Sequence, residues 1–379
     1  MTKTKVLFAA YNLGKGGAER VLATLLENLD TGRIEPVCVL LTGEMVYKIP
    51  EGIKIYVLDS APAGNLFVKV LRTAGRILKV AKIIRRERPQ VLFGFLTGIN
   101  FILFAAGKLS GVRCRTIFSE HSTPSIELYR KTDFIYRSLF KYFYNAADLT
   151  IAVSKGVRDD IIGSFGVRED KVKVIYNPID IEGIQIRKNE PVSTTDWFNG
   201  SLPVVISVGS FAERKAPDYL IRAFKMVRSR LACRLVFLGE GPRKEELVNL
   251  CRELDVEKDV AFLGFMENPH KYVARSSVFV LSSNWEGFGN VLVEAMACGT
   301  PVISSDCPSG PNEIIANNVT GILVPVKDAA GLAAAIYELI SDKEKALKYS
   351  RKAKESINRF SIKNILEEYY GVLILNQQS

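Results

Sequence analysis

The chain has 379 residues, 47% of them hydrophobic and 24% charged, which is ordinary for a globular protein and long enough for two domains. Its net charge of +10 suits an anionic partner: a nucleotide, a nucleic acid or an acidic lipid surface. No apolar run approaches the roughly 20 residues that cross a bilayer, and the cysteines and histidines show no spacing typical of a zinc site.

The N-terminal segment predicts a strand, a glycine-rich loop and a helix. Residues 3–10 are mostly apolar, and Gly14, Gly16 and Gly17 follow them. A helix is expected over residues 18–29, where apolar residues recur at helical spacing. A glycine loop at a helix start can cradle an anion, and a simple turn of clustered glycines is the alternative.

A long helix with a basic stripe is expected over residues 66–88, after strands near 35–42 and 53–58. The stripe includes Lys69, Arg72, Arg76 and Lys79. One interpretation is a solvated surface, and the other is contact with anionic lipid or with the pyrophosphate of a lipid-linked acceptor. No acidic residue interrupts the stripe before Glu87, which favours the second interpretation.

The following strands, at 91–95 and 115–119, lead to a second candidate position. The later strand runs into Glu120 and His121. Ligands of open α/β sheets bind at the carboxyl ends of strands, so His121 is a candidate site residue, with a structural histidine as the alternative. Residues 129–144 are rich in aromatic and basic side chains. We expect core with a partly exposed edge, and an interfacial surface that dips toward lipid is the alternative.

A polar, irregular stretch at 182–201 predicts a linker between two domains. Predicted strands and helices lie on both sides of it. We therefore expect an N-terminal domain at 1–181 and a C-terminal domain at 202–360. His270 starts a short helix in the second domain and is expected to be exposed, without a role in the site.

The strongest signal lies between residues 278 and 305. An apolar run at 278–282 predicts a buried strand, two glycines make a loop, and residues 290–298 predict a helix that Gly299 and Pro301 stop. The next strand follows at once. Unpaired N–H groups in a first helical turn bind phosphate, so this arrangement predicts an anion site.

Two carboxylates bracket this helix start, Glu286 in the loop and Glu294 one turn inside the helix. A diphosphate would be repelled by them, whereas hydroxyl groups favour carboxylate acceptors. The pattern therefore suggests a nucleotide sugar, with hydroxyl-rich groups on both sides of a diphosphate. A tight turn with two solvated glutamates is the alternative, because a single glycine loop is a weak signal.

The run from Glu286 to Pro301, EGFGNVLVEAMACGTP, resembles the Glu–seven residues–Glu signature of the retaining family 4 glycosyltransferases. The resemblance extends over nearly the whole chain. It implies an α/β fold of the GT-B type: two Rossmann-like, doubly wound parallel-sheet domains facing a deep cleft. It also implies that a C-terminal helix within 361–379 crosses back to the first domain. The segment 306–314 is similar to bacterial transferases that add N-acetylhexosamine or galactose-type sugars to lipid-linked glycans.

The resemblance also implies residue roles. Glu294 would bind the ribose hydroxyls, Glu286 would contact the hydroxyls of the transferred sugar, and His121 would lie close to that sugar. Lys215 matches the lysine that holds the diphosphate. The remaining residues expected to bind the donor are Gly16, Gly17, Ser210, Arg214, Leu263, Gly264, Phe265, Gly287, Phe288, Gly289, Asn290 and Val291.

One position departs from the family pattern, because Ser210 stands where the family has an arginine. Arg214 could supply the missing charge, but its place beside Lys215 would point it differently. The second phosphate ligand is therefore left open. The backbone at 263–265 would face the nucleobase.

We accordingly expect a retaining, metal-independent hexosyltransferase without a cofactor. Its donor would be a UDP-sugar carrying a hexose or N-acetylhexosamine, and its acceptor a glycan, free or linked to polyprenyl pyrophosphate. Nucleic acid is not an expected partner. The apolar run at 6–10 is too short for a signal peptide, so we expect a cytoplasmic protein at the inner face of the membrane, in peripheral contact with anionic lipid.

Two other classes of function are the alternatives. One is a nucleotide-sugar epimerase or a phosphorylase on the same fold. The other is a non-catalytic basic protein that binds membranes or nucleic acid in a salt-sensitive manner. Presence of both Glu286 and Glu294 argues against the second.

Overall fold

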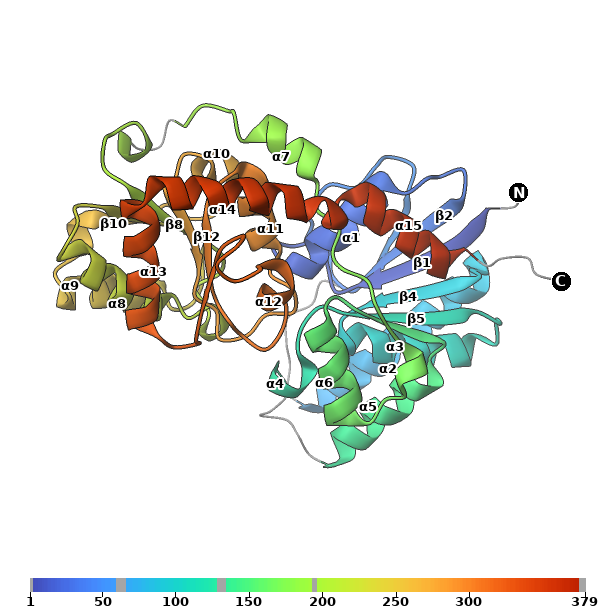
Figure 1. Cartoon of the computed structure of the whole chain (residues 1–379). Helices are drawn as coiled ribbons and strands as arrows, with labels where there is room; N and C mark the ends of the chain where they lie inside the picture. The colour runs from blue at the N-terminus through green and yellow to red at the C-terminus, as the bar shows by residue number, and fades with distance from the viewer. Residues whose placement is uncertain (1–2, 59–65, 128–133, 193–195, 375–379) are drawn as a thin grey trace. The chain divides into compact units, whose positions relative to one another are not determined.

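The computed structural model describes residues 3–58, 66–127, 134–192 and 196–374. The chain divides into two compact units (Figure 1). The first comprises Met1–Pro178 and Ile362–Ser379, and the second comprises Ile179–Ser361. Each unit is an alternation of strands and helices around its own parallel sheet.

The first unit contains, in its described residues, a seven-stranded parallel sheet of order β3-β2-β1-β4-β5-β6-β7. The order reverses at β1, which pairs with β2 on one side and β4 on the other. Its inner strands are almost wholly buried, as expected for a parallel sheet covered by helices on both faces. The strands are β1 (Thr4–Ala10), β2 (Ile34–Leu40), β3 (Lys54–Val57), β4 (Val91–Phe95), β5 (Arg115–Glu120), β6 (Leu149–Ala152) and β7 (Val172–Val174).

The helices of the first unit follow the strands in sequence, except the last, which comes from the end of the chain. They are α1 (Gly17–Asn28), α2 (Leu66–Glu87), α3 (Thr97–Ser110), α4 (Pro124–Glu127), α5 (Phe134–Ala146), α6 (Lys155–Phe165), the 3-10 turn η2 (Glu169–Lys171) and α15 (Ile362–Leu373). Helix α15 lies beside α1 (Figure 1). The Tyr370 hydroxyl accepts a hydrogen bond from the Asp30 N–H at 2.7 Å. Arg115 Nη1 donates to the Val372 carbonyl, also at 2.7 Å.

The second unit contains a six-stranded parallel sheet of order β10-β9-β8-β11-β12-β13 in its described residues. Here the order reverses at β8, which lies between β9 and β11. The strands are β8 (Val204–Val208), β9 (Arg234–Leu238), β10 (Val260–Phe262), β11 (Val278–Leu281), β12 (Val302–Ser305) and β13 (Ile322–Val324).

The helices of the second unit bury an apolar stripe against this sheet. In α8, for example, Leu220, Ile221, Phe224 and Val227 are buried at helical spacing. The helices and 3-10 turns are α7 (Ile181–Arg187), η3 (Asp196–Phe198), η4 (Glu213–Lys215), α8 (Pro217–Arg228), α9 (Lys244–Glu253), η5 (Glu257–Asp259), α10 (His270–Val273), α11 (Asn290–Cys298), α12 (Pro311–Ile314), α13 (Ala329–Ser341), α14 (Lys343–Ser356) and η6 (Ile357–Phe360).

The stretch 182–201, predicted to be irregular, begins with helix α7. The Asp180 carboxylate accepts a hydrogen bond from the Gly183 N–H and caps the helix. Ile184 is fully buried, and Gln185 Nε2 donates to the Ala297 carbonyl of α11. The prediction of irregular structure is wrong for this part, because a cap and one buried side chain stabilise a short helix despite its polar composition.

Candidate functional site

The motif residues of the second unit lie at the carboxyl ends of β8 and β11, the neighbouring strands at which the sheet order reverses. This switch point is where open α/β sheets bind their ligands. The segment 209–215 follows β8, and the segment 282–286 follows β11. Two segments more than 60 residues apart in sequence thus meet at one edge of the sheet.

Hydrogen bonds to three main-chain carbonyls of the first segment help to join the two segments. Ser282 Oγ donates to the Lys215 carbonyl at 3.0 Å, and the Asn284 N–H donates to the Arg214 carbonyl at 2.8 Å. Asn284 Nδ2 donates to the Glu213 carbonyl at 3.1 Å. These bonds hold the 3-10 turn η4, and with it the two basic residues, against the loop after β11.

Glu286 is the centre of this edge. Its side chain is only 5% exposed. Lys215 Nζ lies 2.5 Å from Oε1, and Arg214 Nη1 lies 2.8 Å from Oε2. Ser283 Oγ donates a third hydrogen bond, to Oε1 at 2.6 Å. A buried carboxylate is thus paired with two cations and one hydroxyl, which is the arrangement that makes burial of a charge tolerable.

The charges of this cluster are set by burial and by one another. Burial would raise the pKa of Glu286, but the charges of Lys215 and Arg214 outweigh it and hold that pKa below the usual range. The carboxylate is therefore ionised at neutral pH. Burial lowers the pKa of Lys215, while Glu286 opposes that change. With both cations protonated, the three side chains carry one net positive charge.

Arg214 and Lys215 converge on the same carboxylate although they are adjacent in sequence. The expectation that adjacency would point Arg214 elsewhere is wrong. Both residues lie in η4, and the two carboxylate oxygens of Glu286 each take one of them. Ser210 is exposed just after β8.

The glycine loop and helix α11 form as the sequence predicted, with α11 spanning Asn290–Cys298. Gly289 precedes the helix with φ +95°, a left-handed conformation that favours glycine. The Phe288 ring is buried edge-on against Phe360 at 5.2 Å between centroids. A Cβ on Gly310 would lie 2.0 Å from the Phe288 carbonyl, so that loop can pack here only with glycine.

Residues 287–291 consequently present little side chain to a ligand. Gly287, Phe288 and Gly289 are buried, and Asn290 and Val291 are half-buried. The Phe288 side chain points into the core, so any ligand contact by this residue must use its main chain. That these residues bind the donor stays a prediction.

Glu294 follows on α11 and is buried beside a histidine. Its side chain is 6% exposed, and His270 Nε2 lies 3.4 Å from its Oε2. His270 is 2% exposed, so the prediction that it is exposed is wrong. Helix α10 is drawn against α11, because Cys298 Sγ donates to the His270 carbonyl and Thr300 Oγ1 to that of Val273.

The segment expected to face the nucleobase lies after β10, at the same edge of the sheet. The Leu263 N–H donates to the Phe237 carbonyl at 3.0 Å, and the Gly264 carbonyl accepts from the Gly239 N–H at 2.7 Å. Phe265 is 37% exposed. Its place beside the end of β9 is compatible with base recognition, which stays a prediction.

The glycine loop of the first unit lies after β1, at the corresponding edge of its own sheet. Gly16 and Gly17 are both exposed. A Cβ on Gly16 would lie 2.0 Å from the Glu19 carboxylate, which folds back over the loop from the first turn of α1. Burial, with a smaller contribution from Glu44, raises the pKa of Glu19.

His121 lies immediately after β5, two strands away from the glycine loop in the same sheet. Its ring stacks on Phe95, with 5.2 Å between ring centres, and its Nε2 is 2.9 Å from Ser119 Oγ. Burial lowers its pKa to about 3, so the imidazole is neutral at physiological pH.

Glu120, at the end of β5, was not singled out from the sequence. It is unusual at this edge because its carboxyl group is buried. It is completely buried and accepts hydrogen bonds from Thr97 Oγ1, Asn100 Nδ2 and the Tyr144 hydroxyl. Burial raises its pKa to about 7, and the hydrogen bonds from these neutral donors oppose that rise only in part. The only signal was a carboxylate at the end of an apolar strand.

Helix α2 carries the four residues of the basic stripe, and all four reach the surface to some degree. Lys69 and Lys79 are exposed, and Arg72 and Arg76 are half-buried. Three large apolar side chains on the same helix are more than half exposed, namely Val70, Leu71 and Leu78. On α5, Phe140 and Tyr144 are buried, whereas Ile135, Leu139 and Tyr142 are exposed. No described helix is long and apolar enough to span a membrane.

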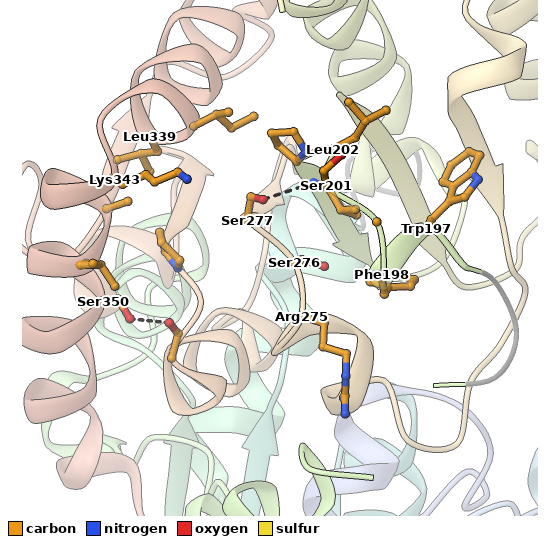
Figure 2. Close-up of a pocket in the computed structure, with 18 residues that line it drawn as sticks. Trp197, Phe198, Ser201, Leu202, Arg275, Ser276, Ser277, Leu339, Lys343 and Ser350 are labelled. Carbon is orange, nitrogen blue, oxygen red and sulfur yellow. Dashed lines mark hydrogen bonds between the residues drawn. The ribbon is translucent and has the colours of Figure 1, made fainter. Parts of the chain in front are cut away.

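A cavity of about 430 Å³ lies elsewhere in the second unit. It is bordered by Val204 at the start of β8 and by Ser277 and Pro301, which directly precede β11 and β12. Figure 2 shows Leu339 and Lys343 on one side of it, and Leu202 on the other. The cavity is at the amino ends of the strands, opposite the edge that carries Glu286, so it is not part of the candidate site.

Comparisons with known proteins identify the family of this chain. Residues 15–182 match the model of glycosyltransferase family 4, and residues 196–356 match that of the group 1 glycosyl transferases. An N-acetylgalactosaminyltransferase of Campylobacter jejuni is 35% identical over 92% of this chain and 94% of its own length. The chain belongs to the family 4 glycosyltransferases. It is therefore a hexosyltransferase of a retaining family.

Two further relatives extend the comparison. A second C. jejuni enzyme, an alpha-1,4-N-acetylgalactosaminyltransferase, is 26% identical over 97% of this chain and 98% of its own length. The crystal structure of Anabaena HepE with UDP and glucose superposes with a TM-score of 0.80, at 22% identity, and covers 98% of this chain and 99% of HepE. The fold is thus GT-B, as the motif implied.

Proposed function

We propose that this transferase moves an N-acetylhexosamine or a hexose from a UDP-sugar to a glycan carried on polyprenyl diphosphate. The observation that carries the proposal is the 35% identity to the C. jejuni enzyme, whose name gives a diphospho-undecaprenol acceptor and N-acetylgalactosamine as the sugar transferred. The second C. jejuni relative is also named for an undecaprenol-linked acceptor. HepE was crystallised with UDP-glucose, which supports uracil as the base of the donor nucleotide.

The donor diphosphate would bind Lys215 and Arg214. Both cations already contact Glu286, but an ammonium has three donors and a guanidinium five, so each can hold the carboxylate and a phosphate together. The net positive charge of the three side chains attracts the diphosphate despite the carboxylate. The N–H groups of the first turn of α11 would add to this attraction. Arg214 would then supply the positive charge that is missing because Ser210 stands at the family's arginine position.

The two carboxylates would hold the hydroxyl groups of the donor. Glu294 would accept hydrogen bonds from the ribose, and Glu286 would orient the transferred sugar. Because the pKa of Glu286 is held low by its cations, it is an acceptor at neutral pH and not an acid. We assign Glu286 a positioning role on the sugar and not that of a nucleophile.

Transfer with retention would proceed on one face of the sugar. The bond from the anomeric carbon to the diphosphate oxygen breaks, and a bond to the acceptor oxygen forms on the same face. The acceptor proton passes to the departing diphosphate, whose growing charge Lys215 and Arg214 stabilise. His121 is neutral at physiological pH, so it would contact the sugar as a hydrogen-bonding group without adding charge.

The acceptor lipid gives the basic helix α2 a role. Its cations and its exposed Val70, Leu71 and Leu78 together match the surface of an interfacial helix. We propose that α2 makes peripheral contact with anionic lipid at the inner face of the membrane and with the pyrophosphate of the acceptor.

A donor screen tests the proposed reaction. Purified protein is mixed with UDP-, GDP- and ADP-sugars, and nucleotide release is measured with and without polyprenyl-pyrophosphate glycans. We expect release of UDP that depends on the acceptor, and a longer glycan as product. Conversion of the donor to an epimer would favour an epimerase, and phosphate-dependent release of sugar 1-phosphate a phosphorylase. Absence of turnover with every donor would favour a non-catalytic protein.

A charge-reversal variant tests the membrane contact. Changing Lys69, Arg72, Arg76 and Lys79 to Glu should abolish binding to vesicles of anionic phosphatidylglycerol, because each basic residue near such a surface contributes about 1 kcal/mol. The matched control reverses four exposed basic residues of α14, namely Lys348, Arg351, Lys352 and Lys354. Vesicle binding and transfer to lipid-linked acceptor that survive the α2 reversal would rule out this role.

A further inference from the structure

His270 is a buried polar side chain whose ring forms no hydrogen bond. It is 2% exposed, and within the described part of the chain neither Nδ1 nor Nε2 has a hydrogen-bond partner. A buried polar group without a partner carries a free-energy cost that an apolar side chain of similar size would avoid. Packing alone therefore does not account for a histidine at this position.

The ring has a charged neighbour. Its Nε2 lies 3.4 Å from Oε2 of Glu294, and the two side chains are 3% and 6% exposed. That separation is longer than the usual N–H···O distance of about 2.7–3.2 Å, so a small movement of either side chain would close a hydrogen bond. Because both groups are buried, little water competes for this contact.

The main chain on both sides fixes where the ring can lie. The His270 N–H donates to Asn268 Oδ1 at 3.1 Å, and Asn268 Nδ2 donates in turn to the Arg187 carbonyl of α7 at 2.8 Å. The His270 carbonyl accepts from Cys298 Sγ at the end of α11. Helix α10 is thereby attached to the helix that carries Glu294, and the ring is held within reach of the carboxylate.

We propose that His270 is a positioning residue for Glu294: its Nε2–H holds the carboxylate in the orientation that accepts the ribose hydroxyls of the donor nucleotide. The inference rests on the proposed ribose-binding role of Glu294. An ionised carboxylate has about four acceptor sites, so the contact with the ring is compatible with two ribose hydroxyls. A support of this kind lowers the cost of ordering the carboxylate when the nucleotide binds.

Binding of two nucleotides to a set of variants tests the proposal. The dissociation constants of UDP and of 2′,3′-dideoxy-UDP are measured by calorimetry. His270→Gln keeps an N–H donor near the position of Nε2, whereas His270→Asn is too short to do so, and His270→Phe keeps the ring volume alone. We expect the Asn and Phe variants to lose about tenfold in affinity for UDP, as for one lost hydrogen bond to a charged group, and almost none for dideoxy-UDP. The Gln variant should retain most of the wild-type preference for UDP over dideoxy-UDP.

The design separates positioning from a general loss of structure. A merely structural histidine would lower the affinity for both nucleotides equally, and that result would overturn the proposal. Thermal melting checks that each variant is folded. If the Phe variant does not fold, the Gln and Asn variants still decide the question, since both are polar and differ only in reach.

A double-mutant cycle with Glu294→Gln separates this inference from the proposed function. In the Glu294→Gln background, loss of the histidine should have almost no further effect on UDP affinity, since the two residues act as one unit. A wild-type protein that binds the two nucleotides equally would refute the role of Glu294, and the inference with it. A wild-type preference for UDP that the Asn and Phe variants retain would refute the role of His270 alone.

Discussion

The two sheet edges of this enzyme each contain a buried carboxylate, and the two differ in their partners. In the second unit, Glu286 is held by Lys215 and Arg214, whose charges keep its pKa below the usual range. In the first unit, Glu120 is held by neutral donors such as Asn100 and Tyr144, and burial raises its pKa to about 7.

The difference in partners indicates which of the two edges keeps its charge at neutral pH. A carboxylate between two cations stays ionised and leaves a net positive charge, which suits an anionic ligand such as a diphosphate. A carboxyl among neutral donors is close to losing its charge at neutral pH, and the neighbouring His121 is neutral as well. The first edge therefore suits uncharged groups, as sugar and acceptor hydroxyls are.

The largest effect on activity is expected at the charged edge, which is the sheet edge of the second unit with Glu286, Lys215 and Arg214. Glu286→Ala should lower the rate of transfer by about 10²-fold or more, because the transferred sugar loses its orienting acceptor, while nucleotide binding is mostly kept. Steady-state rates and calorimetry with UDP measure the two effects. The matched control is Glu338→Ala, which removes a carboxylate paired with Lys345 on the surface of the same unit. Unchanged transfer in Glu286→Ala would remove the role assigned to this residue.

The second prediction concerns Glu120, at the sheet edge of the first unit, and the pH dependence of the free energy of unfolding. Since the pKa of Glu120 is raised in the folded state, its neutral form stabilises the fold at low pH, and this contribution is lost as pH rises from about 4.5 through about 7. Glu120→Gln should remove the loss, which amounts to up to about 3 kcal/mol. Urea unfolding between pH 4.5 and 8.5 measures it, with the exposed Glu127→Gln as control. If the free energy of unfolding varies with pH in the same way in the wild type and in Glu120→Gln, the raised pKa of Glu120 is contradicted.

The two cations of the charged edge should differ from each other. Lys215→Met should weaken UDP binding by about tenfold and Arg214→Met by less, because the Arg214 side chain is 32% exposed and that of Lys215 only 15%. UMP, which lacks the second phosphate, should be affected less than UDP. Lys345→Met is the control, since its lysine pairs with a carboxylate outside the site. Equal losses for UMP and UDP would argue against a diphosphate contact.

The smallest effect concerns His121. Burial lowers its pKa to about 3, so its protonation should not contribute to the pH dependence of transfer between pH 5 and 8. The ratio of wild-type activity to that of His121→Gln should therefore stay constant over this range. A ratio that falls toward pH 5 would mean that the ring becomes charged there, and the contrast between the two edges would weaken.

Much of the charged edge was predictable from sequence because its signals are local. The glycine loop, the helix over residues 290–298 and the spacing of Glu286 and Glu294 are all set within one short segment. Lys215 was identified through the resemblance to the family pattern, which is also local in sequence. The direction of the Arg214 side chain could not be predicted, because it depends on the hydrogen bonds between Asn284 and the 3-10 turn η4.

Sequence alone determined the alternation of strands and helices, the position of the loops at strand ends and the family, since periodicity and glycine placement act over a few residues. Tertiary structure decided which polar groups are buried and what they meet. Glu286 and Arg214 are 72 residues apart, Glu120 meets Tyr144 across the first unit, and His270 meets Glu294 in the second. Burial and charge pairing arise only when distant segments pack, and for that reason the chemistry of these groups could not be predicted from local pattern.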